Sequence, residues 1–230
     1  GAPEEKLRLV RPGTNLDQFV YRDPAASYDG GVVRCMHVGR LTNKKSPLHL
    51  LRAFHRAQEM LGRDVRLQLD IVGTGFLYQQ TRQEIQRLGL EDQVDMHGAR
   101  PHEEIAELLS RAHIYTQHCL TAPNGDTEGL GVSFIEASAC GLPVITTRHN
   151  GIPDVVRHEE SGLLSPEGDI EAMARNLADV ARRPELWTAM GAAGRSHIEH
   201  EYCITKNVGR QVDALARLVR PRTALGVAGA

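Results

Sequence analysis

Two glutamates with seven residues between them, Glu128 and Glu136, are the side chains of this 230-residue chain whose spacing best suits chemistry. Nearly every residue of the segment 132–139 is apolar or small, which predicts a helix buried on all faces. Glu136 would lie within that helix, where an unpaired ionised carboxylate is costly. Glu128 would lie just before it, near the free backbone N–H groups of the first turn. A ligand with both phosphate and hydroxyl groups fits this arrangement, and an acid near a helix end plus a core ion pair is the alternative.

A short run of cationic side chains follows the first expected strand, 32–38. Gly39 lets a ligand approach the backbone closely, Arg40 offers a planar fork of donors, and Lys44 and Lys45 offer point charges. In open α/β sheets, ligands bind beyond the carboxyl ends of the strands, where this loop would lie. The loop is therefore a candidate phosphate site, and a solvated loop is the alternative.

Other sequence motifs give weaker signals. Gly73 and Gly75 follow the second expected strand, but position 78 is Tyr, so we interpret them as a turn rather than a dinucleotide fingerprint. The sequence contains neither a Walker A motif nor a Gly-x-Ser-x-Gly elbow, which argues against P-loop ATPases and triad hydrolases.

Histidine and cysteine residues suggest two further sites that we do not favour. His197, His200 and Cys203 have a spacing that a metal can use, but closed metal sites usually need four ligands, so we expect no metal. His118 and Cys119 suggest a thiol nucleophile, but no paired base can be deduced, and a buried thiol is the expectation.

Composition places the chain among ordinary globular proteins. Hydrophobic residues make up 41% and charged residues 24%, which is enough for a substantial core. The net charge of −2 gives no electrostatic footprint for nucleic acid or an anionic membrane. No apolar run reaches the ~18 residues of a membrane span, and no secretory signal opens the sequence. The four scattered cysteines are typical of reduced thiols, so we expect a cytoplasmic protein.

Apolar periodicity alternates between strand and helix along the chain. Strands are predicted at 32–38, 65–72, 94–97, 113–117, 144–146 and 162–164. Helices are predicted at 47–60, 77–88, 103–110, 132–139, 152–156, 170–181, 185–200 and 206–218. This alternation predicts an α/β fold in which helices cover both faces of a parallel sheet, with extra helices at the C-terminal end.

The segment 128–145 resembles the signature of the retaining glycosyltransferases of family 4, in which two glutamates flank seven residues and an EA-A-GLPV stretch follows. Residues 11–19 resemble the hinge that precedes the family's second Rossmann domain, and the whole resemblance covers about residues 8–218. Further matching segments follow in the family's order: 38–41 (VGRL) with Lys45, 71–75 (IVGTG), 96–98 (MHG), 150–154 (NGIPD) and 161–164 (SGLL). The segments 121–127 and 147–153 resemble those of family members that act on exopolysaccharide or lipid-linked acceptors.

The resemblance implies a GT-B architecture, in which two Rossmann-like domains face each other and this chain is the C-terminal, donor-binding half. It implies a hinge or lead-in over 1–30, a Rossmann-like nucleotide-sugar-binding domain over 31–200, a C-terminal helix over 201–220 and a flexible tail over 221–230. A missing N-terminal domain would hold a glycan or lipid-linked acceptor, and peripheral membrane association would occur only through it. The fragment alone would then be inactive.

The resemblance also implies a role for each site residue. Arg40 and Lys45 would hold the diphosphate of a UDP- or GDP-linked sugar, and Glu128 would face hydroxyls of the donor sugar, so these three would be the catalytic residues. Arg40, Lys45 and the helix dipole would neutralise the leaving diphosphate without a metal or another cofactor. The anomeric configuration would be retained. The full implied nucleotide-sugar site consists of Gly39, Arg40, Lys45, Gly73, Arg100, Glu128, Leu130, Gly131, Val132 and Glu136.

Within this implied site, the backbone amides of 130–132 would meet the phosphates and Glu136 would bind the ribose hydroxyls. Arg100 falls where the family meets the nucleobase, usually with a small apolar residue, so the base stays open. Two alternative functions also stay open. One is a nucleotide-sugar 2-epimerase of the same fold, and the other is a non-catalytic domain that binds a sugar nucleotide as a regulator.

Overall fold

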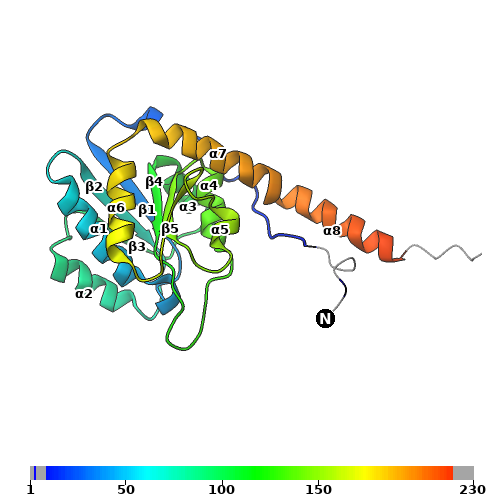
Figure 1. The fold of residues 1–230 in the computed structure, drawn as a ribbon, viewed down its shortest axis with the longest axis horizontal. Helices are drawn as coiled ribbons and strands as arrows, with labels where there is room; N and C mark the ends of the chain where they lie inside the picture. The colour runs from blue at the N-terminus through cyan, green and yellow to red at the C-terminus, as the bar shows by residue number, and fades with distance from the viewer. Residues whose placement is uncertain (1–2, 4–8, 220–230) are drawn as a thin grey trace, which may run out of the picture.

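Six parallel strands form one sheet at the centre of the chain (Figure 1). The computed structural model describes residue 3 and residues 9–219, without the side chains of 217–219, so the tail predicted over 221–230 lies outside the described residues. The strand order is β3-β2-β1-β4-β5-β6. The strands are β1 (Val32–Val38), β2 (Arg66–Val72), β3 (Val94–Gly98), β4 (Ile114–Gln117), β5 (Val144–Thr147) and β6 (Gly162–Ser165). The predicted strands are confirmed, and the sheet is Rossmann-like, with its order reversing between β1 and β4.

Helices cover both faces of the sheet, as the alternation of strand and helix predicts. The α-helices are α1 (Pro47–Leu61), α2 (Tyr78–Leu88), α3 (His102–Arg111), α4 (Val132–Ala139), α5 (Ile152–Val155), α6 (Ile170–Ala181), α7 (Glu185–Glu201) and α8 (Ile204–Val219). Two short 3-10 helices, η2 (Pro24–Ser27) and η3 (Asn43–Lys45), precede α1. Buried side chains of α1, α2 and α6 pack on one face of the sheet, and those of α3, α4 and α5 pack on the other.

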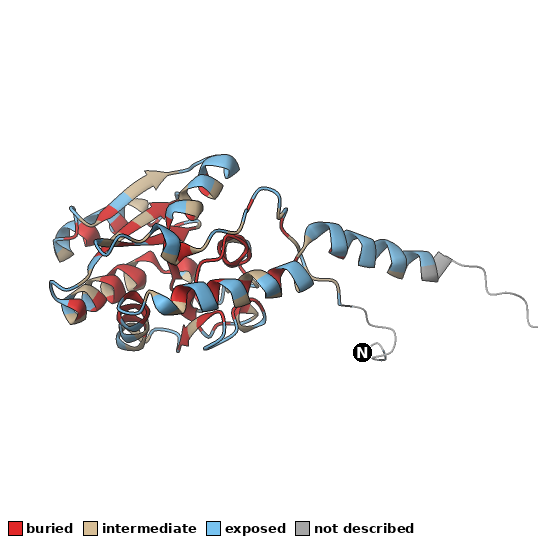
Figure 2. Cartoon of the chain, turned by 90° about the horizontal axis from the view of Figure 1, so that it is seen from above, coloured by how far each residue is buried: buried red, intermediate tan, exposed pale blue. Residues whose placement is uncertain are grey.

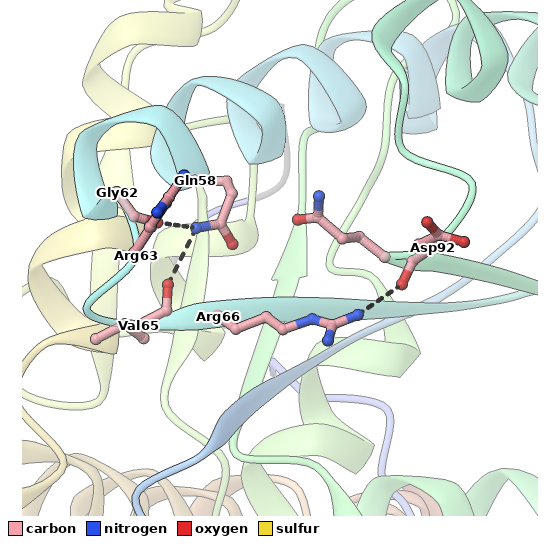
Figure 3. A pocket seen from close by; sticks show the side chains of 7 residues that line it. Gln58, Gly62, Arg63, Val65, Arg66 and Asp92 are labelled. Atoms are coloured by element: carbon pink, nitrogen blue, oxygen red, sulfur yellow. Dashed lines mark hydrogen bonds between the residues drawn. The ribbon is translucent and has the colours of Figure 1, made fainter.

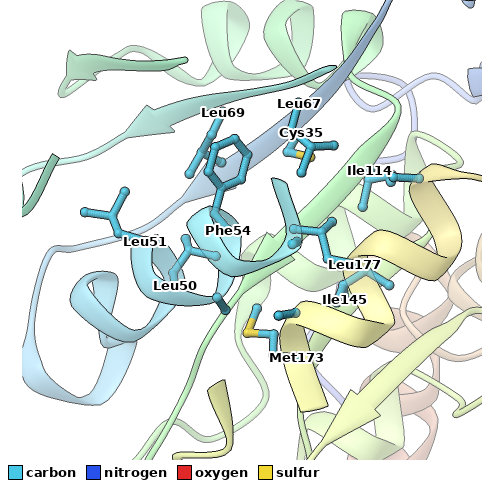
Figure 4. Close-up of a cluster of buried hydrophobic side chains, with 14 of the residues drawn as sticks. Cys35, Leu50, Leu51, Phe54, Leu67, Leu69, Ile114, Ile145, Met173 and Leu177 are labelled. Carbon is cyan, nitrogen blue, oxygen red and sulfur yellow. The ribbon is translucent and has the colours of Figure 1, made fainter. Parts of the chain in front are cut away.

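The core on the first face is largely aliphatic, in keeping with the low aromatic content of 4%. Figure 4 shows Leu50 and Phe54 of α1 packed near Met173 and Leu177 of α6, together with strand side chains such as Ile145. Each of these five side chains is fully buried. Because helices cover both faces of the sheet, polar functional groups are expected at the ends of the strands, where the loops lie.

The described part of the lead-in, residues 9–30, packs against the domain. Phe19 is 1% exposed and joins the second core cluster. The Thr14 N–H donates to the Tyr202 carbonyl at 2.8 Å, and the Ile204 N–H donates to the Thr14 carbonyl at 3.1 Å. The ring of Tyr28 meets Trp187 of α7 edge-on, with 5.0 Å between ring centroids. This segment is therefore tied to α7 and to the start of α8.

Helix α8 runs away from the rest of the domain (Figure 1), and most of its residues are exposed (Figure 2). Its apolar residues recur at helical spacing, and four of them are exposed: Ile204, Val208, Val212 and Leu215. Asn207 anchors the first turn, because its side-chain amide donates to the Glu201 carbonyl at 2.8 Å. In the described part of the chain, no helix has the length and apolar character that crossing a bilayer would need.

Candidate functional site

The ends of β1, β2 and β3 meet through glycine backbones. The Gly39 N–H donates to the Val72 carbonyl at 2.9 Å, and the Gly73 N–H donates to the Gly98 carbonyl at 2.8 Å. A Cβ atom on Gly73 would lie 1.9 Å from the Gly39 carbonyl oxygen, and the φ of Gly73 is +137°. Gly73 therefore does more than form the predicted turn, because it lets two loops touch at the carboxyl edge of the sheet, where Gly39 lies.

Lys45 and Glu128 form an ion pair beside this edge. Lys45 ends η3 and Glu128 lies in the loop before α4, and their Nζ and Oε2 atoms are 3.0 Å apart. The two side chains are only 11% and 15% exposed. The sequence predicted both residues for one site, and the structure brings them into direct contact.

Gln117 and Phe134 complete the surroundings of the Lys45 ammonium group. With the Gln117 amide nitrogen facing the Val38 carbonyl and the Tyr115 hydroxyl, each at 3.1 Å, its oxygen accepts from Lys45 Nζ at 3.1 Å. The ammonium also lies 5.8 Å from the centre of the Phe134 ring. Because a lysine ammonium carries three N–H donors, Glu128 and Gln117 leave one donor for a further partner.

The N-terminus of α4 begins next to this pair. Gly131 is the N-cap residue, with a φ of +72° and no side-chain cap. The first N–H groups of a helix have no intrahelical acceptor, so this end offers uncapped backbone donors and the positive end of the helix dipole. Leu130 is half-buried, and Val132 is 53% exposed at the first helical position.

Glu136 lies one helical turn further on and is 5% exposed. Burial raises the pKa of its carboxyl group, against an opposing influence of His102, whose Nδ1 lies 3.9 Å from Oε1. Within the described residues, no hydrogen bond or ion pair joins Glu136 to Glu128. The structure thus gives the two glutamates different surroundings on one short helix and its preceding loop.

The two predicted arginines are exposed, and among the described residues no hydrogen bond or ion pair joins either of them to Lys45 or Glu128. Arg40 follows Gly39 at the end of β1 and is exposed. Arg100 lies two residues beyond β3, and its guanidinium is 3.6 Å from the Glu104 carboxylate. These positions leave Lys45 as the predicted cation that contacts Glu128.

Sequence reasoning missed His149 and Glu167 as contributors to this site. His149 is 2% exposed, and its Nε2 accepts from the Glu128 backbone N–H at 3.0 Å. Its Nδ1 lies 2.5 Å from Oε1 of Glu167. The other carboxylate oxygen of Glu167 accepts from the Thr121 N–H at 2.8 Å. A usable signal existed, because His149 follows β5 and Glu167 follows β6, at the edge where the strands of such a sheet carry ligands.

Burial or a hydrogen bond to the backbone accounts for Cys119, His118 and His197, which the sequence singled out. Burial raises the pKa of the Cys119 thiol to about 11, which leaves it protonated. Burial also lowers the pKa of His118 to about 3, and its Nε2 accepts from the Gly168 N–H at 3.1 Å. His197 Nε2 bonds to the Asp154 carbonyl oxygen at 2.8 Å. Over residues 9–219, no group of three or more His, Cys, Asp and Glu side chains is arranged to hold a metal.

A hollow of about 470 Å³ lies at the opposite edge of the sheet, where α1 ends and β2 begins (Figure 3). Several of its polar groups form hydrogen bonds with one another. Gln58 donates to the Gly62 and Val65 carbonyls, each at 3.0 Å, and Arg66 donates to the Asp92 carbonyl at 3.2 Å. It has none of the site residues that the sequence predicts.

Residues 29–197 match the protein family described as Glycosyl transferases group 1. The putative colanic acid biosynthesis glycosyltransferase WcaL of Salmonella typhimurium is 35% identical over 182 residues, which are 79% of this chain and 44% of that protein. The GDP-mannose-dependent alpha-(1-6)-phosphatidylinositol monomannoside mannosyltransferase of Mycolicibacterium smegmatis is 32% identical over 203 residues, which are 84% of this chain and 52% of that protein. The chain spans about half the length of the curated relatives it matches.

Solved structures share the fold. Sucrose-phosphate synthase from Thermosynechococcus elongatus matches 92% of this chain and 52% of its own, with a TM-score of 0.78 and 25% identity. Anabaena HepE, solved in complex with UDP and glucose, matches 94% of this chain and 59% of its own, with a TM-score of 0.77 and 19% identity.

Proposed function

The chain belongs to the group 1 glycosyl transferases, and we propose that it binds the donor of such an enzyme, a nucleotide-diphosphate sugar. The observation that carries this proposal is the Lys45–Glu128 pair beside the uncapped start of α4. A cation, free backbone donors and a helix dipole suit the diphosphate, and a carboxylate in the same place suits sugar hydroxyls.

We assign the residues of this donor site as the resemblance implies. Lys45 and Arg40 hold the diphosphate together with the amides of 130–132. Glu128 accepts hydrogen bonds from the donor sugar, and Glu136 accepts them from the ribose. The raised pKa of Glu136 supports its role, because a carboxylate whose charged form is disfavoured by burial gains most from hydroxyl donors.

The finer features of the reaction belong to the same proposal. We assign the chain to family 4, with retention of the anomeric configuration and no metal, because Lys45, Arg40 and the start of α4 supply the positive charge that the leaving diphosphate requires. The name of the mycobacterial relative supports GDP as the carrier, and the HepE complex supports UDP. The names of the relatives support a polysaccharide or lipid-linked glycan as acceptor, which would bind to a part of the enzyme beyond this chain.

Calorimetric titration with UDP, GDP, UDP-glucose and GDP-mannose tests the donor site. Glu136→Gln should weaken a free nucleotide and its sugar derivative equally, by ~1–3 kcal/mol, the scale of hydrogen bonds to a charged group. Glu128→Gln should weaken only the sugar derivative, because Glu128 meets only the sugar. Absence of binding to all four ligands, or identical behaviour of the two variants, would refute these roles.

The same titrations, followed by turnover measurements on an enzyme that contains this chain, separate the remaining alternatives. A transferase releases nucleotide only when an acceptor is present. A 2-epimerase converts its sugar nucleotide without an acceptor, and a regulatory domain binds it without turnover.

A further inference from the structure

The loop 118–131, which carries Glu128, is held in place by side chains from two later strand ends. We propose that Glu167 and His149 form a positioning pair that sets Glu128 for the donor sugar, an inference that rests on the proposed function. Neither residue touches the Lys45–Glu128 contact with its own side chain, so both would act through the backbone of Glu128.

The hydrogen bonds of His149 define its tautomer. Its Nε2 accepts from the Glu128 N–H, so that nitrogen carries no proton. The ring proton must then be on Nδ1, which donates it to Glu167 at 2.5 Å. An imidazole holds the tautomer that its second nitrogen's partner selects, and here that partner is the Glu167 carboxylate.

Glu167 joins both ends of the loop. One of its oxygens accepts from Thr121, near the start of the loop, and the other accepts from His149, which holds Glu128 near its end. Asn150 adds a bond from its amide to the Glu128 carbonyl at 2.9 Å. The backbone of Glu128 is therefore fixed at both its N–H and its carbonyl group, from the segment that follows β5.

The turn that carries Glu167 is itself anchored in the core. The N–H of Gly168, the next residue, donates to Nε2 of His118 at 3.1 Å. His118 is fully buried, and its ring stacks on His49 of α1 with 5.1 Å between centroids. Because this turn is held by a buried side chain, Glu167 can impose a position on the loop instead of following it.

Loss of the Glu167 carboxylate has a defined consequence. The Thr121 N–H loses its acceptor. His149 also becomes free to carry its proton on Nε2, and a proton there would face the Glu128 N–H and abolish that hydrogen bond. Glu128 would then lose the hydrogen bond at its N–H and keep only the one at its carbonyl group, while Lys45, Arg40 and the start of α4 would keep their positions. Binding of the sugar should suffer, and binding of the diphosphate should not.

Two measurements on the chain test this inference. The first is nitrogen–proton correlation NMR of the His149 ring without ligand, in the wild type and in Glu167→Ala. We expect an Nδ1–H tautomer in the wild type and a mixture in the variant. An Nε2–H tautomer in the wild type would overturn the proposal without any ligand, and so would an unchanged Nδ1–H tautomer in Glu167→Ala.

The second measurement is calorimetry with whichever of UDP-glucose and GDP-mannose the wild type binds, and with the matching nucleoside diphosphate. Glu167→Ala should weaken the sugar nucleotide about tenfold, the scale of one lost hydrogen bond to a charged group, and leave the nucleoside diphosphate unchanged. Glu167→Gln, which keeps one acceptor, should be intermediate and serves if the alanine variant fails to fold. Glu160→Ala removes the same charge from an exposed site 3.5 Å from Arg157, so it should change neither affinity.

These outcomes separate a failure of the proposed function from a failure of the positioning role alone. If the wild type binds no sugar nucleotide, the proposed function fails and this inference fails with it. If the wild type binds the sugar nucleotide and both Glu167→Ala and Glu167→Gln bind it as tightly as the wild type does, only the positioning role fails. Equal losses for the sugar nucleotide and the nucleoside diphosphate would mean that Glu167 acts through the whole site, which would also overturn the proposal.

Discussion

Replacement of Lys45 by methionine tests the donor site most directly, because it keeps much of the side-chain volume and removes the charge. If Lys45 binds the diphosphate, Lys45→Met should weaken UDP or GDP by ~1.5–3 kcal/mol, or about 10- to 150-fold, the scale of charge-assisted hydrogen bonds. Binding of a nucleoside without phosphate should not change. Isothermal titration calorimetry with both kinds of ligand measures this difference.

The same variant should also lower stability, by an amount that the structure bounds. Removal of one partner of a buried ion pair costs about 3–5 kcal/mol. The start of α4 offers Glu128 a compensation of about 0.5–2 kcal/mol after Lys45 is lost. We therefore expect a loss of about 1–4.5 kcal/mol, which lowers the melting temperature by about 2–18 °C for a domain of this size.

The double variant Lys45→Met/Glu128→Gln separates stability from binding. It leaves no unpaired buried charge, so its melting temperature should recover most of the loss, while its affinity for the nucleoside diphosphate should stay low. Lys44→Met is the matched control, because Lys44 pairs with the more exposed Asp126 at 3.0 Å and should affect nucleotide affinity little. Wild-type affinity in Lys45→Met, or recovery of affinity together with stability in the double variant, would refute the role of Lys45.

Three further predictions concern the same edge of the sheet. Gly73→Ala should destabilise the chain by ~2–5 kcal/mol in thermal melts, because its Cβ would lie 1.9 Å from the Gly39 carbonyl oxygen, whereas Gly89→Ala, with open space around it, should cost only ~1 kcal/mol. Burial raises the pKa of Glu136 above its ordinary value of 4.5, so its charge lowers stability as the pH rises past that value. Glu136→Gln should therefore raise the melting temperature at pH 7 and leave it almost unchanged at pH 4; a lower melting temperature at pH 7 would contradict this. A chelator should leave nucleotide affinity unchanged in calorimetry, and a strong loss of affinity would indicate a metal site that includes His197.

The sheet and its helices followed from periodicity because each element buries a regular pattern of side chains. Helix α4 is the clearest example, since its run of apolar residues predicted its bounds and the burial of residues 134–139, although Val132 at its start is 53% exposed. The described lead-in shows the limit of this reasoning. Phe19 is buried from a segment without regular structure, and no period in the sequence marks an isolated buried side chain.

The candidate site was predictable at the level of the sheet edge but not at the level of contacts. The spacing from Glu136 selected Glu128, and Gly39 and Lys45 were selected because they follow a strand end, which lies at the carboxyl edge of the sheet. The position after a strand end does not predict that the Lys45 side chain turns toward Glu128, because that contact depends on the path of the long loop before α4. His149 and Glu167 were missed for the same reason, since their partners are backbone N–H groups of that loop.

The contacts around Glu128 change the charge balance that the resemblance implies. Lys45 is partly neutralised by Glu128 before any ligand binds, and His149, which accepts from the Glu128 N–H, adds no positive charge. A doubly charged diphosphate in this place would thus depend on the third donor of Lys45, on the exposed Arg40 and on the amides at the start of α4. A fixed loop matters for such a site, because the Glu128 carboxylate must face the sugar hydroxyls while it keeps its pair with Lys45. A small shift of this carboxylate would lose the contact with the sugar, and hydrogen bonds between the Glu128 backbone and the side chains of His149 and Asn150 oppose that shift.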